Sequence, residues 1–471
     1  MRNGARQACA RARSESHQAC ERRQSDKMKE ASIIELHARR IWDSRGRPTI
    51  EAQVELDDGS VGLGQAPAGA STGRHEAIEL RDGEQDLDHG GYDVQQALKQ
   101  CQSVLRPRLL GLAASDQPLV DQSLIDADKK ANKAMIGANT TIAVSIACAK
   151  AAALSKGLPL FEHLAAAMPE ASKQKNHPDD RWQLPLPQIQ IFGGGAHAGR
   201  RIDIQDLMIT CPAADSVAQA LSWTARVYRA AGEVMRKRRA SFGVADEGGW
   251  WPDFQRNEEA LDCLVESIEI AGLRPGEQVW IALDIAATQW FDKGAYQLAL
   301  EGHELDAAAM IEMLGDWARR YPIASIEDPL AEDDSDGFID FTKALGHRLQ
   351  IVGDDFLVTS AERIKKAASI GAANAVLLKP NQRGTLSETL QAWLAAKAVG
   401  YQGIVSARSG ETEDQSIVHL ALAWQVPQLK VGSFSRGERM VKWNELLRLE
   451  DQLGERAVFV GAKAIASIGS R

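Results

Sequence analysis

Six short apolar runs in the second half of the chain each end in a charged residue. In chain order, the ends are Asp284, Glu327, Asp354, Lys379, Arg408 and Lys430. Successive ends lie between 22 residues (408 to 430) and 43 residues (284 to 327) apart, which leaves room for a strand-to-helix-to-strand crossover. Repeated β-α units of this size predict a parallel sheet, and six in succession favour a closed (β/α)8-type barrel. Active sites of such barrels lie at the C-terminal ends of the strands.

Helical patterns occupy the gaps between these runs. Two of them begin with a pair that is typical of a capping box, Thr359 with Glu362 and Thr385 with Glu388. The pairs predict that helices begin at these positions.

The first half of the chain follows another pattern. Residues 33–64 alternate between apolar and polar positions around the turn pair Asp58-Gly59, which predicts an antiparallel meander. Residues 93–166 change to a helical period, and Gly157 is expected to form a C-cap. We therefore predict an α/β protein with an α+β N-terminal domain (antiparallel meander plus helices) over residues 28–165 and a (β/α)8-type barrel over residues 166–471.

Residues 1–27 are rich in arginine and contain no apolar run, which excludes a secretory signal. Charged segments of low hydrophobicity rarely order, so we expect a disordered tail or a mis-assigned start before Met28. A transit peptide or a nucleic-acid-binding arm is the alternative for this segment.

The overall charge argues against several classes of protein. A net charge of -9 and a pI near 5.7 argue against a broad nucleic-acid-binding surface. No apolar run reaches the 18 or so residues that a membrane span needs, so we expect no membrane partner. The six cysteines are scattered without a C-x-x-C pair, which indicates reduced thiols and a cytoplasmic location.

Three of the strand ends are carboxylates. On a barrel rim, Asp284, Glu327 and Asp354 would present hard oxygen ligands with no histidine or thiolate beside them, and this set favours Mg²⁺. A single acidic strand end often only meets solvent or caps a helix, but three in register are a stronger signal. Lys379 and Lys430 follow on the next strands. Mg²⁺ and a second ammonium would lower the pKa of a lysine there, which suits a base that removes a proton α to a carboxylate.

Many segments of the sequence resemble the enolase family, in order and spacing, over nearly all of residues 32–455. The matching segments are "WDSRGRPTIEAQVELDDGS", "AGASTGRHEAIELRDG", "GANTTIAVSIACAKAAA", "VADEGGWWPDF", "IALDIAAT", "SIEDPLAEDD", "VGDDFLVTS", "LLKPNQRGT", "SARSGETED" and "LKVGSFSRGERMVKWNELLRLEDQL". The resemblance implies a lyase that interconverts 2-phosphoglycerate and phosphoenolpyruvate. It also implies at least a homodimer.

The resemblance assigns a role to each matching residue. Asp284, Glu327 and Asp354 would hold one Mg²⁺, and Ser71 of a flexible lid would bind a second. Lys379 would remove the C2 proton, while Lys430 would neutralise the substrate carboxylate. The remaining residues of the implied site, for the leaving hydroxyl and the anionic group, are Glu247, Asp206, His197, Arg408 and Ser409. Without the resemblance, Glu247 would be assigned to a Gly-rich structural turn and His197 to a structural histidine.

Four positions depart from the family pattern. Ala407 stands where the family has histidine, and Asp206 where it has the longer glutamate. Gly193 replaces an asparagine, and Ala68 replaces a serine. Ala407 and Gly193 predict a pocket that is enlarged on one side. A shortened carboxylate is significant because a misplacement of ~1 Å can cost about a hundredfold in rate.

Three functions remain open at this stage. The first is reversible, Mg²⁺-dependent dehydration of 2-phosphoglycerate, a small phosphorylated acid. The second is an enolase-like reaction on a related acid, such as a phosphonate analogue of the kind used by carboxyphosphonoenolpyruvate synthases. The third is a structural or binding homologue with weakened catalysis, which is disfavoured because such a protein has no reason to retain five charged groups that repel in like-signed sets.

Overall fold

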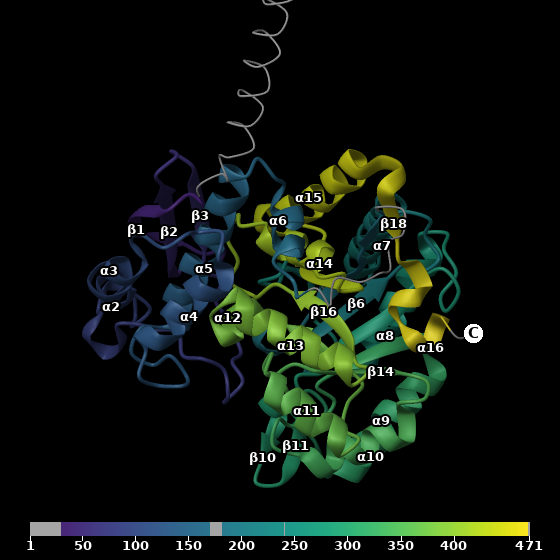
Figure 1. Cartoon of the computed structure of the whole chain (residues 1–471). Coiled ribbons are helices and arrows are strands. Elements are labelled where there is room, and N and C mark those ends of the chain that lie inside the picture. Colours follow the sequence, from purple (N-terminus) through teal and green to yellow (C-terminus); the bar gives the residue numbers. More distant parts are fainter. Residues whose placement is uncertain (1–29, 170–180, 240, 470–471) are drawn as a thin grey trace, which may run out of the picture.

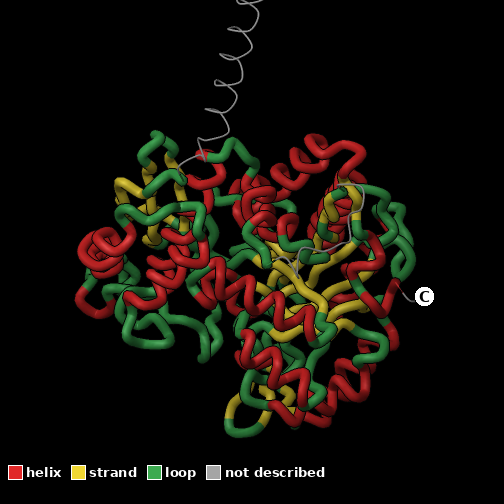
Figure 2. Tube along the Cα trace, viewed as in Figure 1, coloured by secondary structure: helices red, strands yellow, loops and turns green. Residues whose placement is uncertain are grey.

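The computed structural model describes residues 30–169, 181–239 and 241–469. The predicted tail at residues 1–27 lies outside the described part of the chain. Figure 1 shows an N-terminal domain of a small sheet and several helices beside a barrel that is covered by helices. In Figure 2 the barrel strands form the centre of the larger domain.

The N-terminal domain begins with the predicted antiparallel meander. Its strands are β1 (Ile33–Trp42), β2 (Pro48–Leu56) and β3 (Val61–Gln65), paired in the order β1-β2-β3. The helices are α2 (Gln95–Gln100), α3 (Arg106–Leu109), α4 (Gln117–Ala127), α5 (Ala138–Ser155) and α6 (Leu160–Ala166). The predicted change from strand to helix is therefore confirmed.

Helix α5 packs directly against the meander because both surfaces are made of small residues. A Cβ on Gly62 would lie 2.1 Å from the Ala147 carbonyl oxygen, and one on Gly64 would lie 2.1 Å from that of Ala143. Within the described residues, α5 is also the one helix that is long and apolar enough to cross a membrane. Since 83% of it is buried inside the protein, it is a core helix of this domain.

Eight strands close the barrel. They are β5 (Leu186–Gly193), β6 (Asp206–Thr210), β9 (Trp280–Asp284), β13 (Ile323–Glu327), β14 (Gln350–Gly353), β15 (Ala375–Leu378), β16 (Gln402–Ser406) and β17 (Gln428–Ser433). Closure is made by β17, which pairs with β5. The six apolar runs of the sequence lie in β9 and in β13 to β17, which are mutually parallel as predicted.

Helices surround these strands and smaller sheets decorate them. The helices are α7 (Val217–Arg238), α8 (Asn257–Ile270), α9 (Ala307–Arg320), α10 (Ser335–Leu345), α11 (Ala361–Ser369), α12 (Pro380–Arg383), α13 (Leu386–Ala398), α14 (Ser416–Ala423), α15 (Gly437–Leu453) and α16 (Ala466–Gly469). The additional strands are β4 (Trp182–Leu184), β7 (Ser241–Val244), β8 (Trp250–Pro252), β10 (Phe291–Asp292), β11 (Ala295–Leu298), β12 (His303–Leu305) and β18 (Ala457–Phe459).

One barrel strand contradicts the expectation of a fully parallel sheet. β6 runs antiparallel to both β5 and β9. The chain reaches it from β5 through a short connection with no crossover helix, and such a connection can only reverse the strand direction. The first residue of β6, Asp206, therefore pairs with the last residue of β9, Asp284. This reversal brings a residue from the start of a strand to the rim where the other strands end.

The two predicted capping boxes have different outcomes. Thr385 is the N-cap of α13, and its side chain accepts from the Glu388 N–H. The other prediction was wrong by one residue, because Ser360 is the N-cap of α11. Thr359 is buried, and its hydroxyl accepts instead from the backbone N–H of Lys379 at 2.9 Å.

The two domains are joined by a seam of backbone and charged contacts. Ala68 and Gly410 exchange two backbone hydrogen bonds of 2.8 Å, so a loop of the N-terminal domain pairs with the loop after β16. Nearby, Lys150 pairs with Asp414 at 2.7 Å. A Cβ on Gly410 would lie 2.3 Å from Asp43 Oδ2 and 2.7 Å from Arg45 Nη2, so a side chain there would force this buried pair of charged groups to shift.

We expect Gly410→Ala to destabilise the protein by about 1–3 kcal/mol, because the methyl group overpacks the seam. Gly437→Ala is the matched control, since no described residue lies within 4 Å of a Cβ at that position in the first turn of α15. The control should keep or slightly increase stability. Chemical unfolding of both variants measures this, and equal stability of the two would contradict the close fit at Gly410.

The imidazole of His163 in α6 is buried. Neither of its ring nitrogens has a hydrogen-bond partner among the described residues, and the residue is 2% exposed. Burial lowers the pKa of His163 from its usual value of 6.5 to about 4. The folded state therefore holds the neutral imidazole at a pH at which the unfolded chain is already protonated.

Since the unfolded state binds more protons between pH 6.5 and 4, stability should fall as the pH drops through this window. We expect His163→Leu to remove about 2 kcal/mol of that loss. His37→Leu, at an exposed position of β1, is the control and should leave the slope unchanged. Urea unfolding at several pH values checks this. Parallel pH profiles for wild type and His163→Leu would show that His163 does not contribute.

Candidate active site

The carboxyl end of the barrel carries the charged side chains that the sequence pattern placed there. Asp284 and Glu327 are the last residues of β9 and β13, and Lys430 lies in β17. Asp354 and Lys379 directly follow β14 and β15. Four of these residues are buried, and the Lys379 side chain is only 11% exposed. Buried charges are costly unless they are paired, so their partners decide how this rim is held.

Lys430 contacts three carboxylates from three strands. Its Nζ lies 2.8 Å from Glu327 Oε2, 3.0 Å from Asp284 Oδ2 and 3.4 Å from Asp206 Oδ2. Lys379 forms a short ion pair with Asp354. The structure thus brings together the five strand-end residues predicted from the sequence and adds Asp206 from the reversed strand.

The predicted free amine at Lys379 stays a prediction, because it depends on the positive charge of a bound Mg²⁺. Among the protein's own groups, burial lowers the pKa of Lys379, but the Asp354 and Glu327 carboxylates together outweigh burial, and the net direction is upward. The pKa of Lys430 is raised well above its usual value, because Asp284, Glu327 and the neighbouring acids together outweigh its burial. A bound cation would act against the upward shift at Lys379.

The donor set at this rim fits a divalent cation. Glu327 Oε1 is buried and has no hydrogen-bond partner among the residues that the structure describes. Burial and the Asp284 carboxylate raise the pKa of Glu327 well above its usual range, which shows that negative charge is crowded here. Oxygen ligands of this kind suit Mg²⁺, and Asp284, Glu327 and Asp354 are the side chains that would hold it.

These three carboxylates are more widely spread than expected. In the described part of the chain, the groups whose potential ligand atoms all lie within 4.8 Å are Asp86–His89–Asp93, His197–Asp206–Glu247 and Asp328–Asp354–Asp355. The predicted set is not among them, since Lys430 contacts two of its members and Lys379 the third. Asp328 has a backbone role, because it accepts from the N–H groups of Asp354 and Asp355 at 2.9 and 2.7 Å.

A histidine and two acids form a second group beside the lysines. His197 Nδ1 lies 3.4 Å from Asp206 Oδ1 and 3.9 Å from Glu247 Oε1. Burial and the Asp206 carboxylate raise the pKa of Glu247. Burial also raises the pKa of Asp206, but Lys430, His197 and Gln190 together outweigh burial, and the net direction is downward. Two neighbouring acids with pKa values that diverge in this way are suited to different proton-transfer roles.

Glu247 lies in the turn before β8, so the structural-turn interpretation of this segment was correct for its backbone. The backbone carbonyl of Glu247 accepts from the Ser433 N–H at 2.9 Å. Its side chain, however, lines the same cavity as His197 and Lys379. The Gly-rich turn therefore presents an acid to the rim.

Arg408 and Ser409 lie on the loop after β16, next to the N-terminal domain. Arg408 pairs with Glu76 at 2.9 Å, and its Nη2 donates to the backbone carbonyl of Ser71 at 2.9 Å. Arg45 Nη1 donates to the Ser409 hydroxyl at 3.3 Å. The structure thus places Ser71, Arg408 and Ser409 together, and the arginine is held by the predicted lid.

Several residues around this site were missed by the sequence reasoning. Arg439 is fully buried and donates to the carbonyl oxygens of Arg408 and Ser409, at 2.6 and 2.5 Å. Gln190 bonds Asp206, and Glu76 holds Arg408. A buried glutamine, arginine or glutamate inside an otherwise apolar pattern is the signal that could have identified them.

The predicted enlargement of the pocket is wrong on the side of Gly193. A Cβ on Gly193 would lie 2.5 Å from the Ala245 methyl group, so that space is already filled. Ala407 does line the cavity between the lysines and the acids, but the cavity measures only about 20 Å³. That volume holds roughly one water molecule. A three-carbon acid can therefore enter only if side chains or the lid move.

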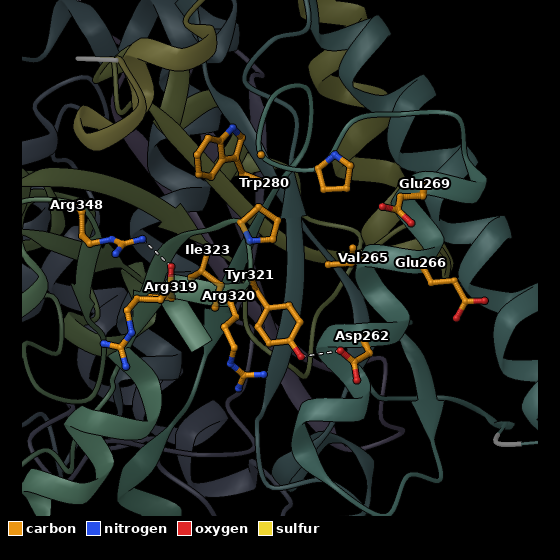
Figure 3. Close-up of a pocket in the computed structure, with 14 residues that line it drawn as sticks. Asp262, Val265, Glu266, Glu269, Trp280, Arg319, Arg320, Tyr321, Ile323 and Arg348 are labelled. Carbon is orange, nitrogen blue, oxygen red and sulfur yellow. Dashed lines mark hydrogen bonds between the residues drawn. The ribbon is translucent and has the colours of Figure 1, made fainter. Parts of the chain in front are cut away.

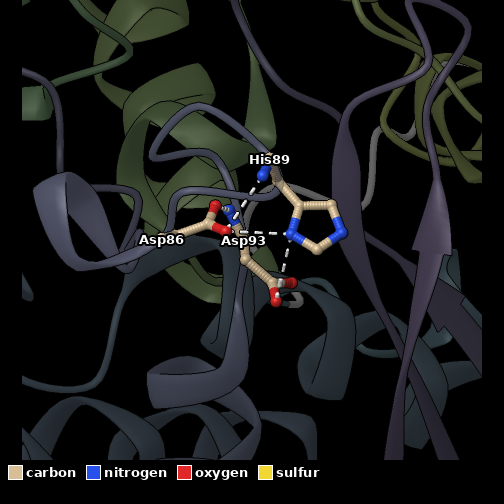
Figure 4. Close-up of side chains that lie close together, drawn as sticks. All are labelled: Asp86, His89 and Asp93. Atoms are coloured by element: carbon tan, nitrogen blue, oxygen red, sulfur yellow. Dashed lines mark hydrogen bonds and ion pairs between the residues drawn. The ribbon is translucent and has the colours of Figure 1, made fainter.

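Two other features of the described residues look like sites but lie away from this rim. The pocket in Figure 3, about 650 Å³, lies at the opposite end of the barrel, beside Trp280 at the start of β9 and Ile323 at the start of β13. In Figure 4 one ring nitrogen of His89 faces the carboxylates of both Asp86 and Asp93. Asp86 accepts from the backbone N–H groups of His89 and Asp93, and Arg40 pairs with Asp93 at 2.8 Å, so the cluster secures a surface loop.

Comparison with known protein families agrees with this geometry. Residues 33–164 match the family described as "Enolase, N-terminal domain", and residues 181–468 match the one described as "Enolase, C-terminal TIM barrel domain". The two matches cover both domains of the structure and most of the chain. The protein therefore belongs to the enolase family.

Proposed function

We propose that this protein is an enolase-type lyase that reversibly dehydrates 2-phosphoglycerate to phosphoenolpyruvate. Membership of the enolase family supports a lyase, and the family typically uses Mg²⁺. The observation that carries the specific proposal is the arrangement around one cavity. Lys379, Lys430 and Asp284 line it together with Asp206, Glu247, Arg408 and Ser409. This arrangement supports the assignment of a base, an acid and anion-binding groups that act on one small substrate.

The residues divide the reaction between two sides of the cavity. Lys379 would accept the C2 proton, and the Lys430 ammonium would neutralise the substrate carboxylate. Mg²⁺ held by Asp284, Glu327 and Asp354 would supply positive charge that stabilises the ene-diolate. A second Mg²⁺, with Ser71 as a ligand, is part of this proposal.

The leaving hydroxyl would be handled by Glu247, Asp206 and His197. The raised pKa of Glu247 keeps its carboxyl protonated at higher pH than an ordinary glutamate, which suits a group that donates a proton to a departing hydroxyl. Asp206 and His197 contact each other beside it. The two halves of the reaction therefore use different groups.

Binding of the substrate requires the site to open. Arg408 is occupied by Glu76, the Ser71 carbonyl and Asn381 Oδ1, so a phosphate could take its guanidinium only in exchange for some of these contacts. Ser71 belongs to the lid, and lid movement would free the arginine and widen the cavity. Arg408 and Ser409 would then hold the phosphate.

A related acid, such as a phosphonate analogue, is the second candidate substrate. The observation that favours it is Ala407, whose methyl group lines the cavity where the family pattern has an imidazole. The two candidates share the C2 proton abstraction and differ in what the Ala407 side of the cavity must accommodate.

We also propose a cytoplasmic homodimer or higher homo-oligomer that acts in glycolysis. Cys101, Cys148, Cys211 and Cys263 are free and buried in the structure, which supports a reducing compartment. The oligomer rests on family resemblance. We also propose that the N-terminal domain begins after residue 27 and that the barrel domain begins after residue 165.

Purified protein with Mg²⁺ should convert 2-phosphoglycerate to phosphoenolpyruvate, measured by the rise in ultraviolet absorbance of the product. Chelation of the metal should abolish the rate, and added Mg²⁺ should restore it. Parallel assays on a phosphonate analogue compare kcat/KM for the two substrates. No conversion of 2-phosphoglycerate above background would eliminate the leading proposal.

Substitutions should separate the two halves of the reaction. Lys379→Ala should abolish both deuterium exchange at C2 and dehydration, while Glu247→Gln should slow dehydration by about 10²–10⁴-fold and retain exchange. Lys366→Ala, at an exposed position on α11, is the control and should behave as wild type. NMR of the substrate in deuterated water measures exchange. Exchange that survives in Lys379→Ala would refute its role as the base.

A further inference from the structure

Gln190 of β5 is a buried amide that holds Asp206. The residue is 1% exposed, and its Nε2 donates a short hydrogen bond to Asp206 Oδ1. Its Oε1 accepts from the backbone N–H of Gly249 at 2.8 Å. Gly249 lies two residues after Glu247, so a single carboxamide connects the reversed strand β6 to the turn that carries the second acid.

The surroundings of Gln190 fit its carboxamide closely. A Cβ on Gly249 would lie 2.4 Å from Gln190 Oε1, and a Cβ on Gly193 would lie 3.2 Å from Gln190 Nε2. Both glycines therefore leave the space that the amide fills. Because one carboxamide makes both hydrogen bonds, a shift of the amide away from Asp206 would also disturb its contact with the Gly249 N–H.

The orientation of the Asp206 carboxylate depends on this contact. Asp206 Oδ2 is buried and has no hydrogen-bond partner among the described residues, although Lys430 Nζ lies 3.4 Å away. Its other oxygen, Oδ1, accepts from Gln190 and lies 3.4 Å from His197 Nδ1. Gln190 therefore provides the close directional contact that fixes the plane of the carboxylate.

We propose that Gln190 is a positioning residue for Asp206 and Glu247, and that its length compensates for the short aspartate. Because Asp206 is one methylene shorter than the glutamate of the family pattern, its carboxylate reaches less far into the cavity. Gln190 spans the remaining distance between Asp206 and the Glu247 turn. The combined length of the Gln190 and Asp206 side chains must then match the distance between the two backbones. This inference rests on the proposed function only for its kinetic consequence.

Exchanging the two lengths tests the proposal. Gln190→Asn should open a gap and lower kcat for dehydration by about 10–100-fold, with little change in KM and in C2 exchange, because Lys379 is not displaced. Asp206→Glu should force its carboxylate against the Gln190 amide and lower kcat by a similar factor. The double variant keeps the total number of methylenes, so its kcat should return to within about threefold of wild type instead of showing the product of the two losses.

Gln188→Asn is the matched control. Gln188 lies two residues earlier in β5, is also 1% exposed, and donates to Gln428 Oε1 at 2.7 Å, away from Asp206. This variant should lose stability as Gln190→Asn does, without changing the ratio of dehydration to C2 exchange. A purely structural role of Gln190 would instead lower dehydration and exchange together, and such a result would overturn the proposal.

The same variants, with the Gln188→Asn/Asp206→Glu double variant added, separate this proposal from the proposed function. If wild type converts neither candidate acid, the proposed function fails, and the free energies of unfolding are compared instead. Length matching would still be supported if the Gln190→Asn/Asp206→Glu double variant loses less free energy of unfolding than the sum of its two single variants. The losses for Gln188→Asn and Asp206→Glu should in that case be additive. Additive losses in both pairs would overturn it.

Discussion

The ammonium group of Lys430 is the contact on which the arrangement of the rim depends. It lies within 3.4 Å of carboxylates from β6, β9 and β13, all buried, and without it these acids would repel one another in a medium that screens poorly. Lys379 does the same for Asp354 on the next strand. These lysines do not neutralise all of the acids, and burial together with the Asp284 carboxylate raises the pKa of Glu327. Charge crowding of this kind costs folding energy, and its oxygen donors are of the type that suits a divalent cation.

Two topological features of the fold bring the charged groups of the cavity together. Reversal of β6 brings Asp206 to the rim beside Asp284, where a parallel strand would have placed it at the far end of the barrel. The seam between the domains then brings Arg45 and Glu76 from the N-terminal domain to Ser409 and Arg408 of the barrel. The cavity is thus built by the barrel on one side and closed by the N-terminal domain on the other.

The sequence predicted those parts of the site that follow from strand periodicity. Asp284, Glu327 and Lys379 stand where apolar runs end, and a closed barrel leaves such residues no place but the rim. Gln190 and the reversal of β6 could not be predicted in this way, because they depend on which residues a connection brings opposite each other. The free space assigned to Gly193 was also wrong, since the neighbour that fills it, Ala245, lies more than 50 residues away in the chain.

The positions that depart from the family pattern do not differ from the strand-end charges in backbone pairing. Gly193 and Asp206 pair with each other at the end of β5 and the start of β6, and Ala407 directly follows β16. What differs is the side-chain contacts. The strand-end charges are held in ion pairs, so the loss of one leaves a buried partner uncompensated. Asp206 bonds to Gln190 on the neighbouring strand, and there a shortened acid can be matched by a longer amide. A change of length shared between these two side chains is therefore easier for this architecture to accommodate than the loss of a strand-end charge.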